Sequence, residues 1–488
     1  MGQKRSYSSD RVGYSRNHSA PIPDTHSVYG QARKLVFGRK LRSKYIFLWC
    51  DEARSGRNGS LFSQYFLLAQ KWPKGQKRPR HPEHLSVLVL GLDSTSRLNT
   101  IRQLPRTRRY LLQELNAFEF LGYNKVGENS YPNLIPLLSG LPSTAVSELI
   151  KDRYYDAMPS LMSLYRRKGY RTLFLEEEPS LGLFTYGYRF NSGFKRAPTH
   201  LYPQAVMRLW KGSTCAILRY VTELLSMGDQ PTFTFAWLTR MSHNDFNSVG
   251  YLDRPLESML RKLSEAGAVN HTAILMLADH GLRFGISRGT EIGREEDKTP
   301  FAFLALPQRF LRRHPEVAVN LEVNQRRLVT AYDFYATLLS IGDLSRFEPA
   351  KTDRGHSLFS PIPPERTCED AVVPPTFCAC ANADVVSIEP SLTLRVFEGK
   401  CVAWRLARLQ DAVATNLNSS MAGKVFFRLS LVTVPEASFE ATGWIPRLDR
   451  WQERRVELVQ RTDAYANHTR CLPHHELQKL CWCREQRT

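Results

Sequence analysis

The stretch that decides the fold is residues 85–97, which read LSVLVLGLDSTSR. Six of the eight residues before Asp93 are apolar. A short, nearly continuous run of Val and Leu is typical of a strand buried on both faces of a parallel sheet. In open α/β sheets, ligands bind beyond the carboxyl ends of the strands. Asp93 therefore has two interpretations at this point: a metal ligand, or a cap of the next helix beside Ser94 and Ser96.

Strand and helix patterns alternate through most of the chain. Strands are expected over 118–126, 171–177, 233–238, 271–279 and 299–307, and helices over 102–115, 132–139, 160–170, 254–267 and 326–342. For the helix at 132–139, Ser130 is the expected N-cap and Gly140 the expected stop. This alternation predicts an α/β fold: a doubly wound, mostly parallel sheet with helices on both faces.

The composition along the chain of 488 residues predicts three parts. Residues 1–44 are polar and basic and are predicted to be disordered or a linker. The α/β domain is expected over 45–360. A Pro-rich stretch follows, and alternating apolar and polar residues beyond it predict a small, Cys-rich, mostly β domain over 361–488.

Cysteines and glycosylation sequons favour the secretory pathway. Seven of the nine cysteines lie in the last quarter of the chain, a density typical of disulfide-linked extracellular proteins. Five N-x-S/T sequons add to this, at Asn17, Asn58, Asn270, Asn418 and Asn467. The N-terminus has no signal-peptide pattern and no apolar run is long enough to cross a membrane. We therefore expect an extracellular glycoprotein whose signal or anchor segment is missing from this sequence.

The formal net charge of +20 favours anionic partners. No motif for DNA or RNA binding accompanies it, so specific nucleic-acid binding is not expected. Each basic cluster alone is more often a solvated face than a binding site.

Acidic, imidazole and hydroxyl groups recur where the predicted core strands end. They are Asp93, Ser130, His243 with the nearby Asp245, Asp279 and His280. Aspartate and histidine are suitable ligands for a divalent ion such as Zn²⁺ or Mn²⁺. A hydroxyl at a helix N-terminus can act as a nucleophile beside such an ion. Each residue alone is more often structural, so the prediction depends on several of them following successive strands.

The order of these motifs resembles that of a known superfamily. A strand followed by Asp comes first, then a Ser before a helix, and then a strand followed by Asp-His-Gly. This order resembles the alkaline phosphatase superfamily, which includes sulfatases and phosphoethanolamine and lipoteichoic-acid transferases. The runs LGLDSTSRLN, LGYNKVGENSYPNLIPLLSGLP, MSHNDFNSVGYLD and LADHGLRFG more closely resemble a domain-of-unknown-function family known mainly from nematodes and arthropods. Members are usually predicted to be extracellular, and the match covers roughly residues 45 to 485.

The resemblance implies roles for individual residues. Asp93, Asp279 and His280 match metal ligands, and Ser130 matches a nucleophile that also touches the metal. His243 matches a second-site ligand or a histidine that contacts the transferred group. His356, in RGHSLF, could supply a further histidine, although this run could equally be a turn; Asp245 is a weaker candidate.

Two departures from the superfamily pattern narrow the chemistry. Ser130 and Pro132 agree with the sulfatase motif C/S-x-P-x-R, but Leu134 replaces its Arg. Formylglycine chemistry is therefore not expected, and direct attack of a serine alkoxide on phosphorus fits better. A full two-zinc site requires an Asp where this chain has Thr239, which favours one ion over two.

Two functional hypotheses follow. The first is a metal-dependent hydrolase or transferase of phosphate esters, less favourably sulfate esters, in which Ser130 attacks and His243 assists the leaving oxygen. Its substrate would be anionic, with a glycan or a lipid headgroup as candidates. The second is a catalytically inactive secreted glycoprotein that keeps the fold and acts as a binding module.

Overall fold

The structure is a computed structural model. It describes residues 12–15, 41, 43–51, 60–71, 84–150, 154–186, 192–210, 212–228, 230–343, 349–380, 384–385, 393–394, 404–415, 424–447, 450–463, 469 and 480–483. Most of the segment 1–44 and four of the five sequons lie outside these residues. Asn270, the remaining sequon, is exposed.

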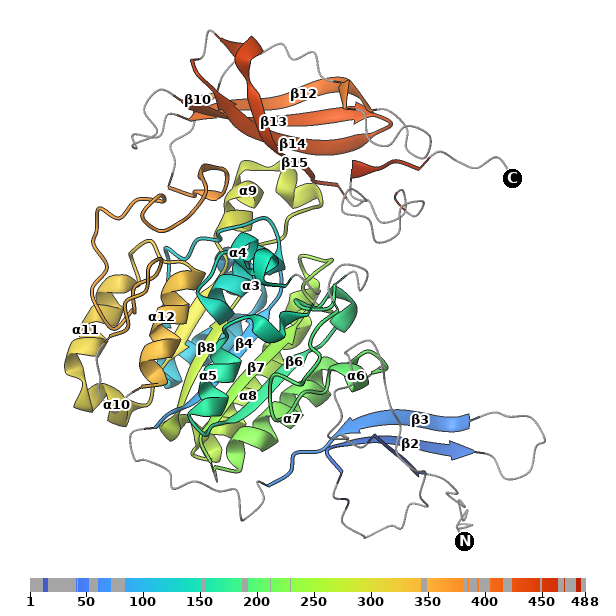
Figure 1. The fold of residues 1–488 in the computed structure, drawn as a ribbon, viewed down its shortest axis with the longest axis vertical. Coiled ribbons are helices and arrows are strands. Elements are labelled where there is room, and N and C mark those ends of the chain that lie inside the picture. The colour runs from blue at the N-terminus through green and yellow to red at the C-terminus, as the bar shows by residue number, and fades with distance from the viewer. Residues whose placement is uncertain are drawn as a thin grey trace.

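A six-stranded sheet forms the centre of the α/β body (Figure 1). Its order is β5-β9-β8-β4-β7-β6. The bounds are β4 Ser86–Leu92, β5 Phe118–Glu119, β6 Arg171–Glu176, β7 Thr232–Leu238, β8 Thr272–Leu277 and β9 Ala302–Ala305. Strands β8, β4, β7 and β6 are mutually parallel, while β9 and β5 run antiparallel at one edge. The predicted α/β fold with a mostly parallel sheet is confirmed.

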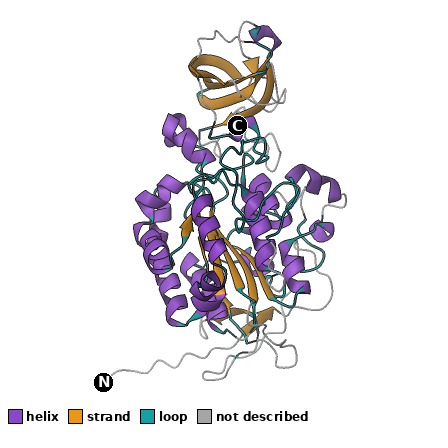
Figure 2. Cartoon of the chain, turned by 90° about the vertical axis from the view of Figure 1, so that its left-hand side faces the viewer, coloured by secondary structure: helices purple, strands orange, loops and turns teal. Residues whose placement is uncertain are grey.

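Helices cover both faces of this sheet, as the turned view shows (Figure 2). Their bounds are α1 Arg97–Gln103, α2 Pro105–Arg109, α3 Ser130–Ser139, α4 Ser143–Leu149, α5 Leu161–Arg167, α6 Gln204–Met207, α7 Thr214–Ser226, α8 Asp253–Glu265, α9 Glu291–Lys298, α10 Gln308–Arg313, α11 Pro315–Asn324 and α12 Ala331–Ile341.

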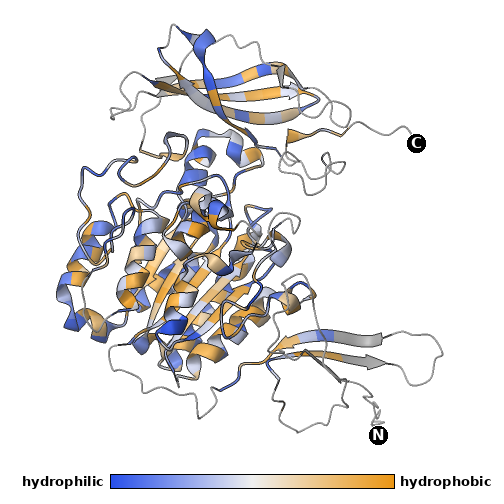
Figure 3. Cartoon of the chain, viewed as in Figure 1, coloured by the Kyte–Doolittle hydropathy of each residue, from blue (hydrophilic) through white to orange (hydrophobic). Residues whose placement is uncertain are grey.

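Alternate residues of each strand supply two separate apolar cores. In β4, Val87 and Val89 pack with α3, α5 and α12 on one face. Leu88 and Leu90 pack with α7 and α8 on the other. Because both faces are buried, the central strands are continuously apolar (Figure 3). This double burial is the physical reason that the run at 85–92 predicted the fold.

An antiparallel hairpin precedes the body. It consists of β2 Tyr45–Asp51 and β3 Ser60–Leu67, with β1 Val12–Ser15 added at its edge.

A second, antiparallel sheet lies at the C-terminal end (Figure 1). Its bounds are β10 Asp384–Val385, β11 Thr393–Leu394, β12 Trp404–Thr415, β13 Val425–Val434, β14 Ala437–Ile445 and β15 Arg455–Arg461. The predicted mostly β region is confirmed. Contacts join it to the body: Arg288 pairs with Glu440 at 3.1 Å, and the Gly285 amide donates to the Thr462 carbonyl at 2.8 Å.

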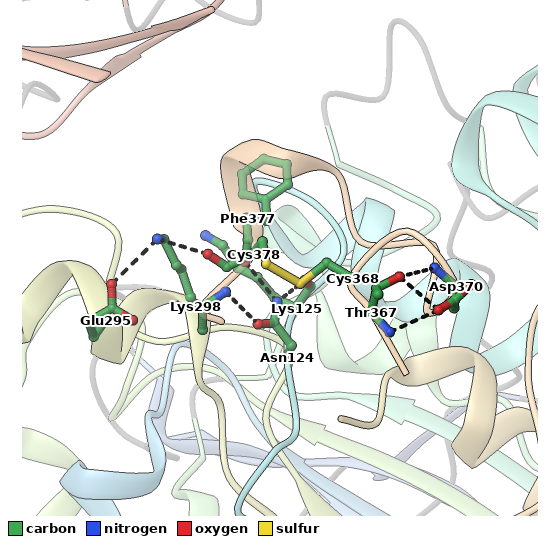
Figure 4. The surroundings of a disulfide bond; sticks show 10 residues. Asn124, Lys125, Glu295, Lys298, Thr367, Cys368, Asp370, Phe377 and Cys378 are labelled. Carbon is green, nitrogen blue, oxygen red and sulfur yellow. Dashed lines mark hydrogen bonds and ion pairs between the residues drawn. A yellow bond between two sulfur atoms is a disulfide. The ribbon is translucent and has the colours of Figure 1, made fainter. Parts of the chain in front are cut away.

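The Cys-rich region contains disulfides, as predicted. Cys368 and Cys378 form one (Figure 4), and Cys481 and Cys483 are also disulfide-bonded. Cys368 and Cys378 belong to a small apolar cluster with Tyr332 of α12. The segment just after residue 360 thus packs on the α/β body, and the domain boundaries at 44 and 360 stay predictions.

Two local predictions were wrong in detail. The helix expected over 102–115 is divided at Leu104, because Pro105 begins a new helix, and its last turn, Tyr110–Glu114, is a π-helix. The strand expected over 118–126 ends at Glu119. The Phe120 amide still donates to Ala302 of β9, but the next amide, that of Leu121, donates to the Gln325 carbonyl instead.

Candidate active site

Two neighbouring parallel strands bring the predicted acidic residues together. In the β4–β8 pairing Gly91 lies opposite Leu277, and Asp93 and Asp279 each follow two residues later. Ligand atoms of Asp93, Asp279 and His280 lie within 4.8 Å of one another. We call these three residues the triad. Their exposed fractions are 3%, 0% and 1%, so the triad is almost fully removed from solvent.

Backbone amides hold the Asp279 carboxylate from one side. The amides of Ser94 and His280 donate to Oδ1 of Asp279 at 3.1 and 3.0 Å. Ser94 reaches this position with φ of 55°, in the left-handed region, and its hydroxyl donates to Oδ1 of Asp93 at 2.8 Å. Strained backbone of this kind is concentrated at functional sites. Ser94 therefore orients the triad, whereas Ser96 is the N-cap of α1, as predicted.

The other oxygen of Asp279 faces a second acceptor. Nδ1 of His280 lies 2.7 Å from the Gly281 carbonyl oxygen, which can only accept, so Nδ1 carries the ring proton. The lone pair of Nε2 is then 3.3 Å from Oδ2 of Asp279. Oδ2 is buried and has no donor among the described residues. Two acceptors this close need a cation or a proton between them.

Burial sets the charge state of the triad. It raises the pKa of Asp93 well above its ordinary value, and the neighbouring Asp279 carboxylate raises it further. Burial lowers the pKa of His280 to about 4. At neutral pH the imidazole is therefore neutral, the form that coordinates metals. A divalent cation would compensate the acidic pair without protonating the histidine.

The chemistry of the donors fits such an ion. Two aspartates and one neutral imidazole are ligands that Zn²⁺ and Mn²⁺ accept. Among the described residues, the other grouping with metal-ligand spacing is Cys368, Cys378 and Cys380, of which two are joined in a disulfide. The triad is therefore the better candidate metal site.

Ser130 is the first residue of α3 and is partly buried. The prediction that it caps this helix was wrong: Asn129 is the N-cap, and its side chain accepts from the Tyr131 amide at 3.2 Å. Asn133 fixes the preceding loop by accepting from the Val126 and Gly127 amides. Ser130 makes no hydrogen bond to the triad in the part of the chain that the structure describes.

His243 lies in the loop after β7, on the side of Arg283 and Asp279. Burial lowers its pKa; a hydrogen bond with Asn244 opposes this shift, Arg283 adds to it and Asp279 opposes it. Nδ1 of His243 is 2.7 Å from Oδ1 of Asn244. Its ring centroid is 6.0 Å from that of Phe284. His243 therefore faces the segment that follows the triad.

The two weaker candidates have local partners. Asp245 is exposed and accepts from the amides of Asn247 and Ser248 at 2.9 and 2.7 Å, as a turn cap does. The His356 amide donates to Asp333 at 2.8 Å. Burial lowers the pKa of His356, and the charges that act on it are those of Arg366, Asp333 and Lys351 rather than those of the triad.

A layer of buried charges behind the triad was not predicted. Lys125 pairs with Asp297 at 2.6 Å, Arg288 pairs with the same carboxylate at 3.2 Å, and Arg288 also contacts Glu440 of the C-terminal sheet. Each of these side chains is at most 8% exposed. Lys125 also lies 5.0 Å from the ring of Phe377, beside the disulfide (Figure 4). This chain of ion pairs links the surroundings of His280 to the C-terminal sheet.

Arg283 and Glu128 were also missed. Arg283 lies three residues after His280, and Glu128 two residues before Ser130. Nη1 of Arg283 is 3.6 Å from Oε1 of Glu128. This contact brings the loop before α3 next to the segment after the triad. A basic residue so soon after Asp279-His280-Gly281 was the sequence signal that could have indicated it.

The fold and the site define a class: an α/β protein with an acidic and imidazole metal-type triad at the carboxyl ends of its central parallel strands. The chain belongs to the family described as protein of unknown function (DUF229), whose model matches residues 12–402. The family resemblance expected from the motifs is thereby confirmed, although the family model ends at residue 402 and not near 485. Among curated protein sequences, none matches this chain.

A comparison with solved structures finds matches at low sequence identity. One is a protein of the alkaline phosphatase superfamily from Vibrio parahaemolyticus, at 14% identity and TM-score 0.42, covering 78% of this chain and 84% of that one. Another is the C-terminal periplasmic domain of phosphoethanolamine transferase EptC from Campylobacter jejuni, at 12% identity and TM-score 0.38, covering 57% of this chain and 94% of that one. A third is the sulfatase PsFucS1 from Pseudoalteromonas sp., at 12% identity and TM-score 0.40, covering 76% of this chain and 85% of that one.

Proposed function

We propose that this protein is a metal-dependent hydrolase or transferase of phosphate esters, with sulfate esters as the less favoured substrates. The observation that carries the proposal is Oδ2 of Asp279, which has no donor among the described residues and faces the lone pair of His280 Nε2 at 3.3 Å. A buried acceptor pair without a donor is costly unless a cation occupies the space between. Asp93, Asp279 and His280 would hold one divalent ion, Zn²⁺ or Mn²⁺.

The bound ion would supply Lewis-acid activation of a hydroxyl and compensation of the charge on a phosphoryl group. Ser130, which we propose as both nucleophile and metal ligand, stands at the N-terminus of α3. The dipole of this ten-residue helix favours an oxyanion at its N-terminus. Oγ of Ser130 forms the bond to phosphorus while the bond to the departing alcohol oxygen breaks.

His243 would carry the proton between these groups. Its Nδ1–H is directed at Asn244, so Nε2 of the neutral ring is an acceptor. It can take up the Ser130 proton and return it to the departing oxygen. Since burial lowers the pKa of His243, the ring is neutral and able to start this transfer at neutral pH.

The substrate would be an anionic ester, and glycans and lipid headgroups bearing phosphate or sulfate are the candidates. The formal net charge of +20 favours their approach. The disulfides and the exposed Asn270 sequon support an extracellular protein. Within the described ranges, no helix combines the length and apolar composition that crossing a bilayer needs.

The test is turnover of nitrophenyl phosphate mono- and diesters and nitrophenyl sulfate by protein supplied with Mn²⁺ or Zn²⁺. Ser130→Ala should lower turnover by at least a hundredfold. The dissociation constant for the metal should change by less than a factor of ten, because the triad is intact. Ser147→Ala is the matched control, because Ser147 is exposed and, among the described residues, its hydroxyl donates to the Ser143 carbonyl of its own helix. Thr95→Ala is not suitable, because the Thr95 hydroxyl donates to the Asp93 carbonyl. Equal turnover by wild type and Ser130→Ala would contradict the proposal and favour a binding module.

A further inference from the structure

Arg283 lies between the triad and the loop that precedes Ser130. It follows His280 by three residues in the sequence, and its Nη1 is 3.6 Å from Oε1 of Glu128 in that loop. Its charge acts on Asp93, on His243 and on His280. The guanidinium is therefore close to the triad, to His243 and to the start of α3 at once.

Its hydrogen-bonding capacity is not used up within the described residues. Nε of Arg283 is buried and has no acceptor there. The contact with Glu128 is longer than a hydrogen bond. The side chain is 20% exposed, so a ligand can reach it. A guanidinium in this state can still form the paired hydrogen bonds that bind phosphate and sulfate.

Two other cations near the triad are already paired with carboxylates. Lys125 is 1% exposed and bonded to Asp297, and Arg288 is 4% exposed between Asp297 and Glu440. Helix α3 supplies no cation at its fifth residue, since Leu134 is 2% exposed in the apolar core. Among the described side chains near the triad, Arg283 is therefore the cation that can contact an anionic ester beside the bound ion.

We propose that Arg283 is the residue that binds the anionic group of the substrate, holding its non-bridging oxygens between the triad and Ser130. This inference depends on the proposed function and names its substrate-binding cation. Glu128 then has a defined role as well: it holds the guanidinium in place and competes with the anion for it. Glu128 therefore makes ligand binding weaker than Arg283 alone would.

The two residues give opposite predictions. Arg283→Gln should weaken binding of inorganic phosphate by about ten- to a hundredfold, the range for a charge-assisted hydrogen bond. Glu128→Gln should strengthen it by a few fold, because the competing carboxylate is lost. If the pair only stabilised the loop, both variants would weaken binding together.

The experiment is calorimetric titration of phosphate and sulfate into full-length protein with Mn²⁺ bound, with metal content measured for each variant. Arg309→Gln is the matched control, since Arg309 is an exposed arginine on α10 and should leave phosphate affinity unchanged. Arg283→Lys keeps the charge without the planar fork and should bind several-fold more weakly than wild type. It provides the answer if Arg283→Gln does not fold.

The outcomes separate this inference from the proposed function. Wild-type phosphate affinity in Arg283→Gln or, if that variant does not fold, in Arg283→Lys, at wild-type metal content, would overturn the role of Arg283 alone. If the wild-type protein takes up no divalent metal, the proposed function is overturned. The measurement of metal content shows this without any phosphate. Weaker binding in Arg283→Gln with stronger binding in Glu128→Gln supports the inference.

Discussion

Replacing Asp279 by Asn should stabilise the metal-free protein and abolish metal binding. The asparagine oxygen can accept from the Ser94 and His280 amides as Oδ1 does now. Its amide nitrogen would stand where Oδ2 is, 3.3 Å from Nε2 of His280, and would donate to it. One substitution therefore gives a hydrogen bond to a position whose buried oxygen has no donor among the described residues, and it removes a charge beside Asp93.

The size of the effect follows from that atom. A buried polar group without a partner costs about 1–3 kcal/mol, and the new hydrogen bond adds about 1 kcal/mol at most. Metal-free Asp279→Asn should thus unfold with a free energy about 1–3 kcal/mol higher than wild type. With free metal at a hundred times its dissociation constant, wild type gains about 2.7 kcal/mol and the variant gains nothing, so the order reverses or closes.

The assay is guanidinium denaturation followed by tryptophan fluorescence, with chelator and with Mn²⁺. Asp253→Asn is the matched control. Asp253 is also buried, but both of its oxygens accept amide hydrogen bonds, from Arg106 and Thr107. Asparagine offers one acceptor fewer, so the free energy of unfolding of this variant should be about 1.5–3 kcal/mol lower than that of wild type, with or without metal. If metal-free Asp279→Asn is destabilised as Asp253→Asn is, the electrostatic reasoning about the triad is wrong.

Three further perturbations test the surroundings of the site. A Cβ at Gly281 would lie 2.0 Å from the Glu296 carbonyl oxygen. Gly281→Ala should therefore lower the free energy of unfolding by about 1–3 kcal/mol and weaken metal binding. Denaturation and calorimetry measure the two effects, and unchanged values would contradict the close packing. Arg288→Met leaves Glu440 without its closest cation and should lower the free energy of unfolding by about 3–5 kcal/mol in the same denaturation assay. A loss under 1 kcal/mol would contradict the importance of this buried ion pair. Burial lowers the pKa of His200 to about 4 from an ordinary 6.5, so its contribution to stability is present above pH 6.5 and is lost as the pH falls toward 4. His200→Gln should flatten the stability curve over that range, and an unchanged slope would exclude His200 as the group responsible.

The triad could be predicted because local rules determine it. Runs of Val, Leu and Ile marked β4 and β8, and neighbouring parallel strands end at the same edge of a sheet. Asp93 and Asp279 each follow such a run, so their meeting needed no knowledge of distant contacts. The two separate cores also followed from the alternating faces of these strands.

The missed residues depend on contacts between distant parts of the chain. Lys125 finds Asp297, and Glu128 finds Arg283, only once the loop before α3 lies beside the segment after β8. No period or spacing relates these positions. Lys125 in particular belonged to a predicted strand, because its neighbours are apolar enough to suggest one. The strand ends early since the chain beyond Phe120 bonds to the segment near Gln325 instead of to β9.

Helix boundaries failed for a related reason. The apolar period of 102–115 continues across Pro105, but the proline begins a new helix and a π-helical turn ends the segment. Ser130 and Asn129 are both good N-caps, and the sequence does not decide between them. The structure selects Asn129, which leaves the Ser130 hydroxyl free of a capping role.

The central claim is that the triad holds one divalent ion, and anomalous diffraction from crystals of the protein soaked with Mn²⁺ tests it most directly. We predict one strong peak between Asp93, Asp279 and Nε2 of His280, absent from crystals of Asp279→Asn. A Mn²⁺-soaked wild-type crystal with no peak there, in the presence of intact side-chain density, would contradict the claim.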